Sequence, residues 1–133
     1  MIHDVGPRYP KNEGRDGFQA EDNTLRNAYA ASMRIAQERS IKYLGFSLLS
    51  AGIFSGAQDL AKIVRIGIEV IVANSYEGLQ EVHLVGFSPP EQVALRQQLK
   101  QLDRGRGGGG VSIGGGKKRR SARQANEQKK RRR

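Results

Sequence analysis

The sequence predicts an α/β fold, in which strands and helices alternate along the chain and helices cover the faces of one sheet. Apolar residues repeat with a helical period over residues 25–36, whereas residues 41–49 form a near-continuous apolar run, which is typical of a buried strand. Over the first hundred residues such segments follow in the order β-α-β-α-β-α. The connections predict parallel strands joined by right-handed crossovers.

The chain opens on a short apolar run, Met1–Val5, which ends at the turn signal Gly6-Pro7, so we expect a strand there. A polar loop rich in glycine and proline follows. Because compact domains usually connect their elements with ~4–6 residues, we expect this long loop to be functional or mobile. The next helix is expected to be capped by Asp22 or Asn23 and to end near Arg39-Ser40.

Two further strands are expected over residues 41–49 and 81–87, and a largely apolar helix over residues 57–74 joins them. The segment Ser88-Pro89-Pro90-Glu91 is a strong helix start, because the serine is an N-cap residue, the first proline suits the first helical position and the glutamate completes a capping box. This last helix is expected to end near Leu102.

The charge of the chain lies in its last quarter. The formal net charge is +10, yet residues 1–100 hold 11 basic and 11 acidic residues, whereas residues 101–133 hold 12 basic and 2 acidic ones. Residues 105–116 are mostly glycine. We therefore expect a folded domain over 1–103 and a disordered glycine-rich linker and basic tail over 104–133. Cysteine is absent, which excludes disulfides and Cys-based zinc sites.

The turn from Ser50 to Gly56 is the best candidate for a ligand site. It joins a predicted buried strand to a helix, which is where α/β sheets bind ligands. Its small residues would let main-chain N–H groups approach a phosphate, and the following helix would add the positive end of its dipole. On spacing alone, a plain strand-to-helix turn explains the same glycines.

Four segments of the chain resemble motifs of the macro domain family, in the family's order and spacing. Residues 1–7 resemble its V-I-H-x-V-G-P strand, residues 25–33 its L-R-x-x-Y-x-x-S-L helix, residues 44–56 its A-F-P-x-I-S-T-G-I-F-G-x-P loop, and residues 82–87 its last strand, V-x-x-V-x-F-D. The resemblance extends to about residue 102 and includes none of the tail.

The resemblance implies a partial three-layer α/β/α fold that binds ADP-ribose or ADP-ribosylated proteins and needs neither a cofactor nor a metal. The family's S-T-G loop wraps the diphosphate and distal ribose, and the aromatic residue that closes the last strand packs on the adenine. The residues implied to contact the ligand are Ser50, Ala51, Gly52, Ile53, Phe54 (beside the distal ribose) and Phe87 (on the adenine).

The chain departs from the family pattern at several positions. Ala51 replaces the threonine of the loop, Ser47 replaces its proline, and Ser88 replaces the aspartate after the last strand. The G-D-I, N-A-A-N and G-G-G-V motifs of the family's N-terminal half have no counterpart here. We therefore expect a truncated macro domain without catalytic residues of its own: a binding module, a defective form of one, or the remnant of an ADP-ribosyl hydrolase.

The other chemically suggestive residues have plainer interpretations. His3 and His83 lie on expected strands, where packed or hydrogen-bonded histidines are usual, and Asp16, Glu21 and Asp22 are interpreted as solvated loop carboxylates.

The basic tail offers the alternative function of non-specific nucleic-acid binding, or a nuclear-import signal, so we expect a nuclear or cytoplasmic protein. The sequence shows no signal peptide and no apolar run long enough to span a membrane. The residues of the tail's two clusters are Lys117, Lys118, Arg119, Arg120, Lys129, Lys130, Arg131, Arg132 and Arg133.

A fluorescent protein fused to residues 104–133 is expected to accumulate in the nucleus of a eukaryotic cell, because two basic clusters on an exposed tail can each act as an import signal. Microscopy measures the nuclear-to-cytoplasmic ratio, and replacing the basic residues of both clusters with glutamine should abolish the accumulation. An even distribution of the unaltered fusion would contradict the prediction.

Overall fold

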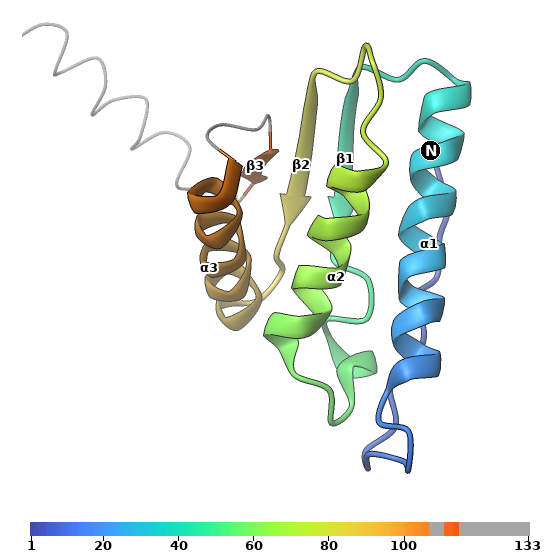
Figure 1. The fold of residues 1–133 in the computed structure, drawn as a ribbon, viewed down its shortest axis with the longest axis vertical. Helices are drawn as coiled ribbons and strands as arrows, with labels where there is room; N and C mark the ends of the chain where they lie inside the picture. Colours follow the sequence, from blue (N-terminus) through green and yellow to red (C-terminus); the bar gives the residue numbers. More distant parts are fainter. Residues whose placement is uncertain (107–110, 115–133) are drawn as a thin grey trace, which may run out of the picture.

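The computed structural model describes residues 1–106 and 111–114. Helices and strands alternate through this part of the chain, as Figure 1 shows. The elements are α1 (Gln19–Glu38), β1 (Tyr43–Ser47), the single-turn 3₁₀ helix η1 (Ile53–Ser55), α2 (Leu60–Ala73), β2 (Glu81–Val85), α3 (Pro89–Arg106) and β3 (Val111–Gly114).

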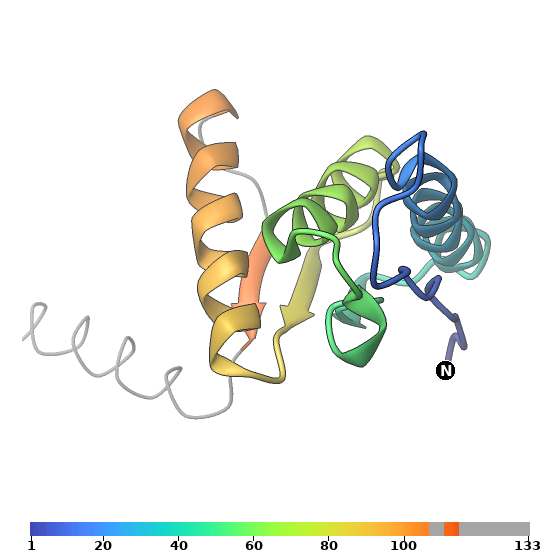
Figure 2. The ribbon, with the colours of Figure 1, turned by 90° about the horizontal axis from the view of Figure 1, so that it is seen from below.

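The three strands form one parallel sheet in the order β1-β2-β3, which confirms the predicted α/β class and the predicted parallel pairing. Tyr43 lies opposite Glu81 and Ser47 opposite Val85. The helices form a single layer over one face of this sheet, with α2 between α1 and α3 (Figures 1 and 2). The third layer that the family resemblance implies is not among the described residues.

The expected strand over Met1–Val5 was wrong. These residues form no ladder with another strand in the described part of the chain, and they run beside α1 instead. The Asp4 carboxylate accepts a hydrogen bond from the Ser32 hydroxyl of α1, and the side chains of Ile2 and Asp4 are half-buried while those of Met1 and Val5 are exposed. The apolar run therefore packs on a helix and does not add a strand to the sheet of the described residues.

The structure also differs from the prediction near the C-terminal end. α3 continues to Arg106 rather than ending near Leu102, and Val111–Gly114 adds β3 to the edge of β2, within a segment predicted to be disordered. The sequence Val111-Ser112-Ile113 alternates β-branched residues, and pairing supplies hydrogen-bond partners to the otherwise free edge of β2. The rest of the predicted tail lies outside the described residues.

α1 begins at Gln19, earlier than the sequence predicts, so the prediction that Asp22 or Asn23 caps it was wrong. Phe18 is the N-cap residue and makes no side-chain cap. Its ring is buried in an edge-on contact with Tyr9, 5.7 Å between centroids, and its carbonyl accepts from the Asp22 N–H at 2.8 Å. Aromatic packing fixes this helix start, where a polar cap was expected.

Two other predicted helix ends agree with the structure, whereas α2 begins at Leu60, three residues later than predicted. α1 ends in a Schellman motif: Ser40, at φ +53°, donates its N–H to Gln37, and Ile41 donates to Ala36. α3 begins at Pro89, and the Glu91 carboxylate accepts from the Ser88 N–H at 2.6 Å, as in the predicted capping box.

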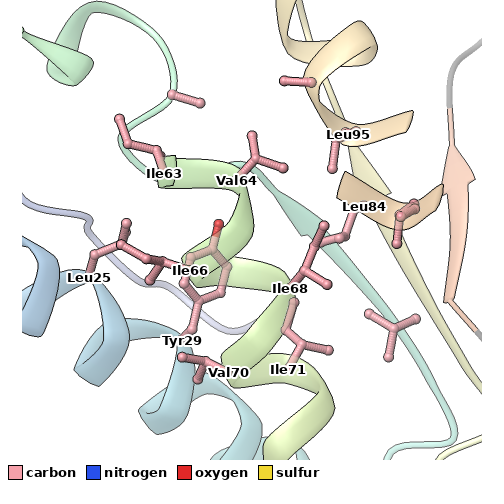
Figure 3. Packing of buried hydrophobic residues seen from close by; sticks show 14 of the residues in the cluster. Leu25, Tyr29, Ile63, Val64, Ile66, Ile68, Val70, Ile71, Leu84 and Leu95 are labelled. Atoms are coloured by element: carbon pink, nitrogen blue, oxygen red, sulfur yellow. The ribbon is translucent and has the colours of Figure 1, made fainter. Parts of the chain in front are cut away.

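Tyr29 joins both layers of the core (Figure 3). It is fully buried, and its ring lies 5.6 Å from that of Phe46 on β1. Its hydroxyl accepts from the Leu49 N–H at 3.0 Å. Its ring also faces Gly67 of α2 so closely that a Cβ atom added there would lie 2.8 Å from the ring. The close approach of α1 and α2 therefore depends on the missing side chain at Gly67.

The outer edge of β1 is free in the described part of the chain. The Lys42 carbonyl accepts from the N–H of Glu81 at 3.2 Å, and main-chain groups of alternate strand residues point the same way. The N–H and C=O groups of Tyr43, Gly45 and Ser47 therefore point away from β2, where no described residue pairs with them.

Replacing Gly67 with alanine should lower the free energy of unfolding by about 1–3 kcal/mol, because the new methyl group must displace the buried Tyr29 ring. Urea unfolding measures this change in the free energy of unfolding. Gly45→Ala is the matched control, since its Cβ would meet nothing within 4 Å, and it should change stability by less than about 0.5 kcal/mol. Equal stability of the two variants would contradict the packing argument.

Candidate ligand-binding site

Two segments of the predicted site leave the sheet at the same edge. Residues 50–56 follow the carboxyl end of β1, and Phe87 follows the carboxyl end of the neighbouring parallel strand β2. The exposed fractions are 93% for Ile53, 39% for Phe54 and 95% for Phe87, whereas Ser50 and Ala51 are buried. Large apolar side chains at this edge are therefore available to a ligand.

The main chain of the turn carries a run of unused donors. The N–H groups of residues 52–54 have no hydrogen-bond acceptor among the described residues. Residues 49–50 form a turn that directs the Ala51 N–H back toward the Leu48 carbonyl, and the N–H groups of Leu49 and Ser55 are bound to Tyr29 and Gly52. Consecutive N–H groups in a turn form a concave site with a positive local potential. Such a run is suited to bind an anionic oxygen group.

Residues 7–10 run alongside the turn and hold it at three points. The Ser50 hydroxyl donates to the Pro7 carbonyl, the Tyr9 N–H donates to the Phe54 carbonyl at 2.8 Å, and the Ala57 N–H donates to the Pro10 carbonyl at 2.9 Å. None of these contacts uses the N–H groups of residues 52–54. The turn is thus fixed in shape while its donors stay free.

The backbone of the turn takes left-handed conformations at both ends, with φ +59° at Ser50 and φ +53° at Gly56. Only glycine fits at the second position, because a Cβ there would lie 2.3 Å from the Tyr9 carbonyl and 2.4 Å from the Pro10 carbonyl.

The start of α2 contributes differently from what the sequence suggests. Asp59 is its N-cap, and the carboxylate accepts from the Ala61 N–H at 3.1 Å. A negative side chain thus already occupies the positive end of this helix dipole. That the dipole of α2 adds to the anion site stays a prediction, and the turn's own N–H groups are the donors that the structure shows without an acceptor among the described residues.

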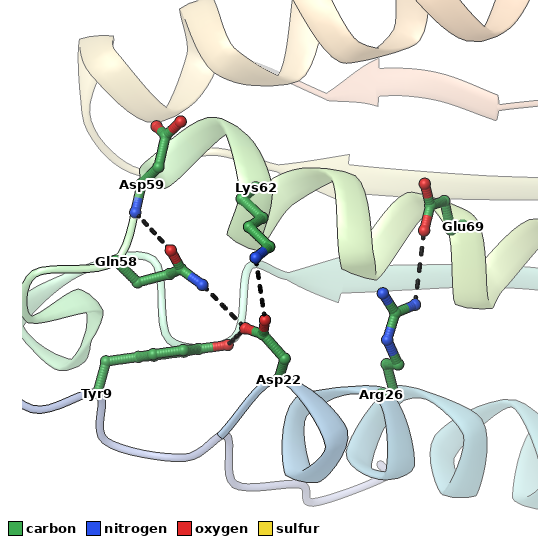
Figure 4. A network of polar contacts seen from close by, with 7 residues as sticks. All are labelled: Tyr9, Asp22, Arg26, Gln58, Asp59, Lys62 and Glu69. Atoms are coloured by element: carbon green, nitrogen blue, oxygen red, sulfur yellow. Dashed lines mark hydrogen bonds and ion pairs between the residues drawn. The ribbon is translucent and has the colours of Figure 1, made fainter. Parts of the chain in front are cut away.

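A buried polar network lies behind the turn (Figure 4). The Asp22 carboxylate accepts from the Tyr9 hydroxyl at 2.7 Å and from the Gln58 side-chain amide at 3.0 Å, and it pairs with the Lys62 ammonium at 3.4 Å. A more exposed ion pair, Arg26–Glu69 at 3.5 Å, also joins α1 to α2.

The network changes the ionisation of its members. Burial and the hydrogen bond to Asp22 raise the pKa of Tyr9 well above its ordinary value. Burial alone would raise the pKa of Asp22, but the hydrogen bonds from Tyr9 and Gln58 and the Lys62 charge outweigh it, and this pKa lies below its ordinary value. The stability that Asp22 contributes is therefore complete above the unfolded pKa of about 4 and is lost as the pH falls through the lower folded value.

Sequence reasoning missed this network and interpreted Asp22 as a solvated loop carboxylate, which was wrong. The signal was present, because Asp22, Leu25 and Tyr29 lie at i, i+3 and i+7 on the buried face of α1. Tyr9 gave a weaker signal as a large aromatic residue in a polar loop; it is 2% exposed.

The remaining candidates show no ligand site. His3 is exposed, and the His83 Nε2 lies 2.8 Å from a carboxylate oxygen of Glu81. Within the described residues there is no group of three or more side chains that could hold a metal ion. None of the helices in the described part of the chain is long and apolar enough to cross a membrane. The basic tail clusters lie outside the described residues.

Residues 1–64, which include the turn and residues 7–10, match the family model of the macro domain. The chain belongs to the macro domain family. The resemblance of the sequence motifs is thereby confirmed, and the α/β sheet with its turn after β1 is the described part of a macro domain.

Relatives of known sequence agree with this assignment. A macro domain-containing protein of Caldanaerobacter subterraneus is 31% identical over 106 residues, which are 78% of this chain and 56% of that protein. A macro domain-containing protein of Cupriavidus necator is 28% identical over 74% of this chain and 54% of its own length. The O-acetyl-ADP-ribose deacetylase 1 of Pantoea vagans is 29% identical over 65% of this chain and 48% of its own length. The chain thus spans about half the length of these relatives.

Gly56→Ala is expected to destabilise the macro domain by about 2–4 kcal/mol, because a left-handed backbone at a non-glycine residue costs about 1–2 kcal/mol and contact with the Tyr9 and Pro10 carbonyls adds to it. Gly78→Ala is the matched control, since Gly78 has φ +97° but nothing within 4 Å of an added Cβ. Chemical denaturation measures the free energy of unfolding of both variants and so separates backbone strain from the contact of the added Cβ with the two carbonyls. If both variants lost the same free energy of unfolding, that contact would have no effect.

Proposed function

We propose that this macro domain binds ADP-ribose, free or attached to a protein, at the carboxyl edge of its sheet. One observation carries the proposal: the N–H groups of residues 52–54 form a consecutive run without an acceptor among the described residues. A diphosphate brings several anionic oxygens to one place, and charge-assisted hydrogen bonds from main-chain N–H groups to such oxygens are strong. The diphosphate of ADP-ribose is placed on this run.

The two ends of the ligand are assigned to the exposed aromatic residues. By resemblance to the family, we place the Phe54 ring, which lies on the same turn as the donors, beside the distal ribose. By the same resemblance, we place the Phe87 ring, which follows the neighbouring strand and is almost fully exposed, on the adenine. Stacking on adenine would cover apolar surface that is otherwise in water. Ser50 takes part through its main chain, since its hydroxyl is bound to Pro7.

The proposed activity is binding, although two of the related proteins are named O-acetyl-ADP-ribose deacetylases. Main-chain N–H groups hold and orient a diphosphate, but they do not take up or deliver a proton during hydrolysis. The described turn therefore supports recognition of the ligand and assigns no residue to catalysis.

Calorimetric titration with ADP-ribose tests the proposal. Gly52→Glu should weaken binding by about a hundredfold or more, because it places a carboxylate beside the diphosphate. An added Cβ at Gly52 meets nothing within 4 Å, so the fold should tolerate the change.

A control accompanies this variant. Gln97→Glu adds the same charge to the exposed surface of α3 and should bind as the wild type does. Wild-type affinity in Gly52→Glu would reject this site, and the absence of any binding to the wild-type chain would reject the function.

A further inference from the structure

Tyr9 connects the ligand turn to the helices. Its main-chain N–H donates to the Phe54 carbonyl at 2.8 Å, and its hydroxyl donates to the Asp22 carboxylate of α1 at 2.7 Å. The ring between them is 2% exposed and contacts Phe18 edge-on. One buried side chain therefore links the turn to α1 over a short, rigid path.

Asp22 extends this link to the other side of the turn. Its carboxylate also accepts from the amide of Gln58, which lies two residues after Gly56, and pairs with Lys62 in α2 (Figure 4). The same carboxylate thus binds the two segments that lie beside the turn. These are residues 7–10, which precede α1, and residue 58, which precedes α2.

We propose that Tyr9 and Asp22 are positioning residues for the ligand turn, and that their hydrogen bond keeps the N–H groups of residues 52–54 aimed at one anionic group. The proposal rests on the proposed function for the identity of the ligand. Neither side chain needs to touch the ligand, because both act through the main chain of residues 7–10.

The groups of the turn that bind residues 7–10 differ from the groups proposed to bind the ligand, and this difference supports the positioning role. The contacts of residues 7–10 use the Ser50 hydroxyl, the Phe54 carbonyl and the Ala57 N–H, and they leave the N–H groups of residues 52–54 without an acceptor among the described residues. If residues 7–10 moved, the Phe54 carbonyl would lose its donor, and the free N–H groups would no longer keep one orientation. Preorganised donors bind more tightly because the ordering cost has already been met.

The test uses the full chain and compares Tyr9→Phe with Tyr76→Phe. Both changes remove one phenolic hydroxyl that donates a hydrogen bond, but Tyr76 donates to the Ile41 carbonyl, near the amino end of β1 and away from the turn. Tyr9→Phe should weaken ADP-ribose binding about tenfold, because a partner of a charged buried group is lost, whereas Tyr76→Phe should leave the affinity unchanged. Asp22→Asn should weaken binding at least as much as Tyr9→Phe, because the same carboxylate also accepts from Gln58 and pairs with Lys62.

A second readout does not depend on the ligand. The amides of Tyr9, Ser55 and Ala57 are hydrogen-bonded around the turn, so their hydrogen exchange reports its local opening, and the amide of Ile66 in α2 reports opening of the core. The measured quantity is the exchange rate at these three amides divided by the rate at Ile66. Compared with the wild type, this ratio should rise about tenfold in Tyr9→Phe and stay unchanged in Tyr76→Phe.

The outcomes separate the two proposals. Faster local exchange with weaker binding supports both. If the wild-type chain binds no ADP-ribose, the proposed function fails, and the exchange ratio alone decides whether Tyr9 positions the turn. Exchange that rises equally at the turn and at Ile66, or unchanged exchange together with unchanged affinity in Tyr9→Phe, overturns the positioning role.

Discussion

The contact between the Tyr29 ring and Gly67 sets the spacing on which the rest of the structure depends. It allows α1 and α2 to approach closely, and the same ring reaches Phe46 in the sheet. Its hydroxyl then accepts from the Leu49 N–H, just before the ligand turn begins. A side chain at position 67 would push α1 from α2 and would move the start of the turn with it.

Two buried tyrosines thus define the ends of the ligand turn. Tyr29 holds Leu49 through its hydroxyl, and Tyr9 holds Phe54 through its main chain. Burial raises the pKa of Tyr29 to about 12, and Tyr9 is shifted further in the same direction, so both hydroxyls stay protonated across the physiological range. The turn between these two anchors keeps its shape while its own donors remain unused.

Much of this arrangement could be predicted from local sequence. The apolar run around β1 and the small residues after it located the ligand turn, and Ser88 with Glu91 located the start of α3, because each feature depends on a few neighbouring residues. Met1–Val5 was assigned wrongly because an apolar run does not reveal whether a strand lies beside it.

The features that could not be predicted depend on distant partners. Asp22 became a buried acceptor only because Tyr9, Gln58 and Lys62 arrive from other parts of the chain, and β3 forms where the edge of β2 offers partners to a segment of low sequence complexity. A carboxylate on the apolar face of a helix was the one local sign of the network.

The outer edge of β1, with which no described residue pairs, has a consequence for how the protein behaves in concentrated solution. The main-chain groups of Tyr43, Gly45 and Ser47 form a template on which another extended chain can align, and the strand carries apolar side chains that favour such pairing. The formal net charge of +10 opposes contact between molecules, but dissolved salt screens this repulsion over about 10 Å at 0.1 M. Ionic strength therefore sets the balance between colloidal repulsion and lateral assembly.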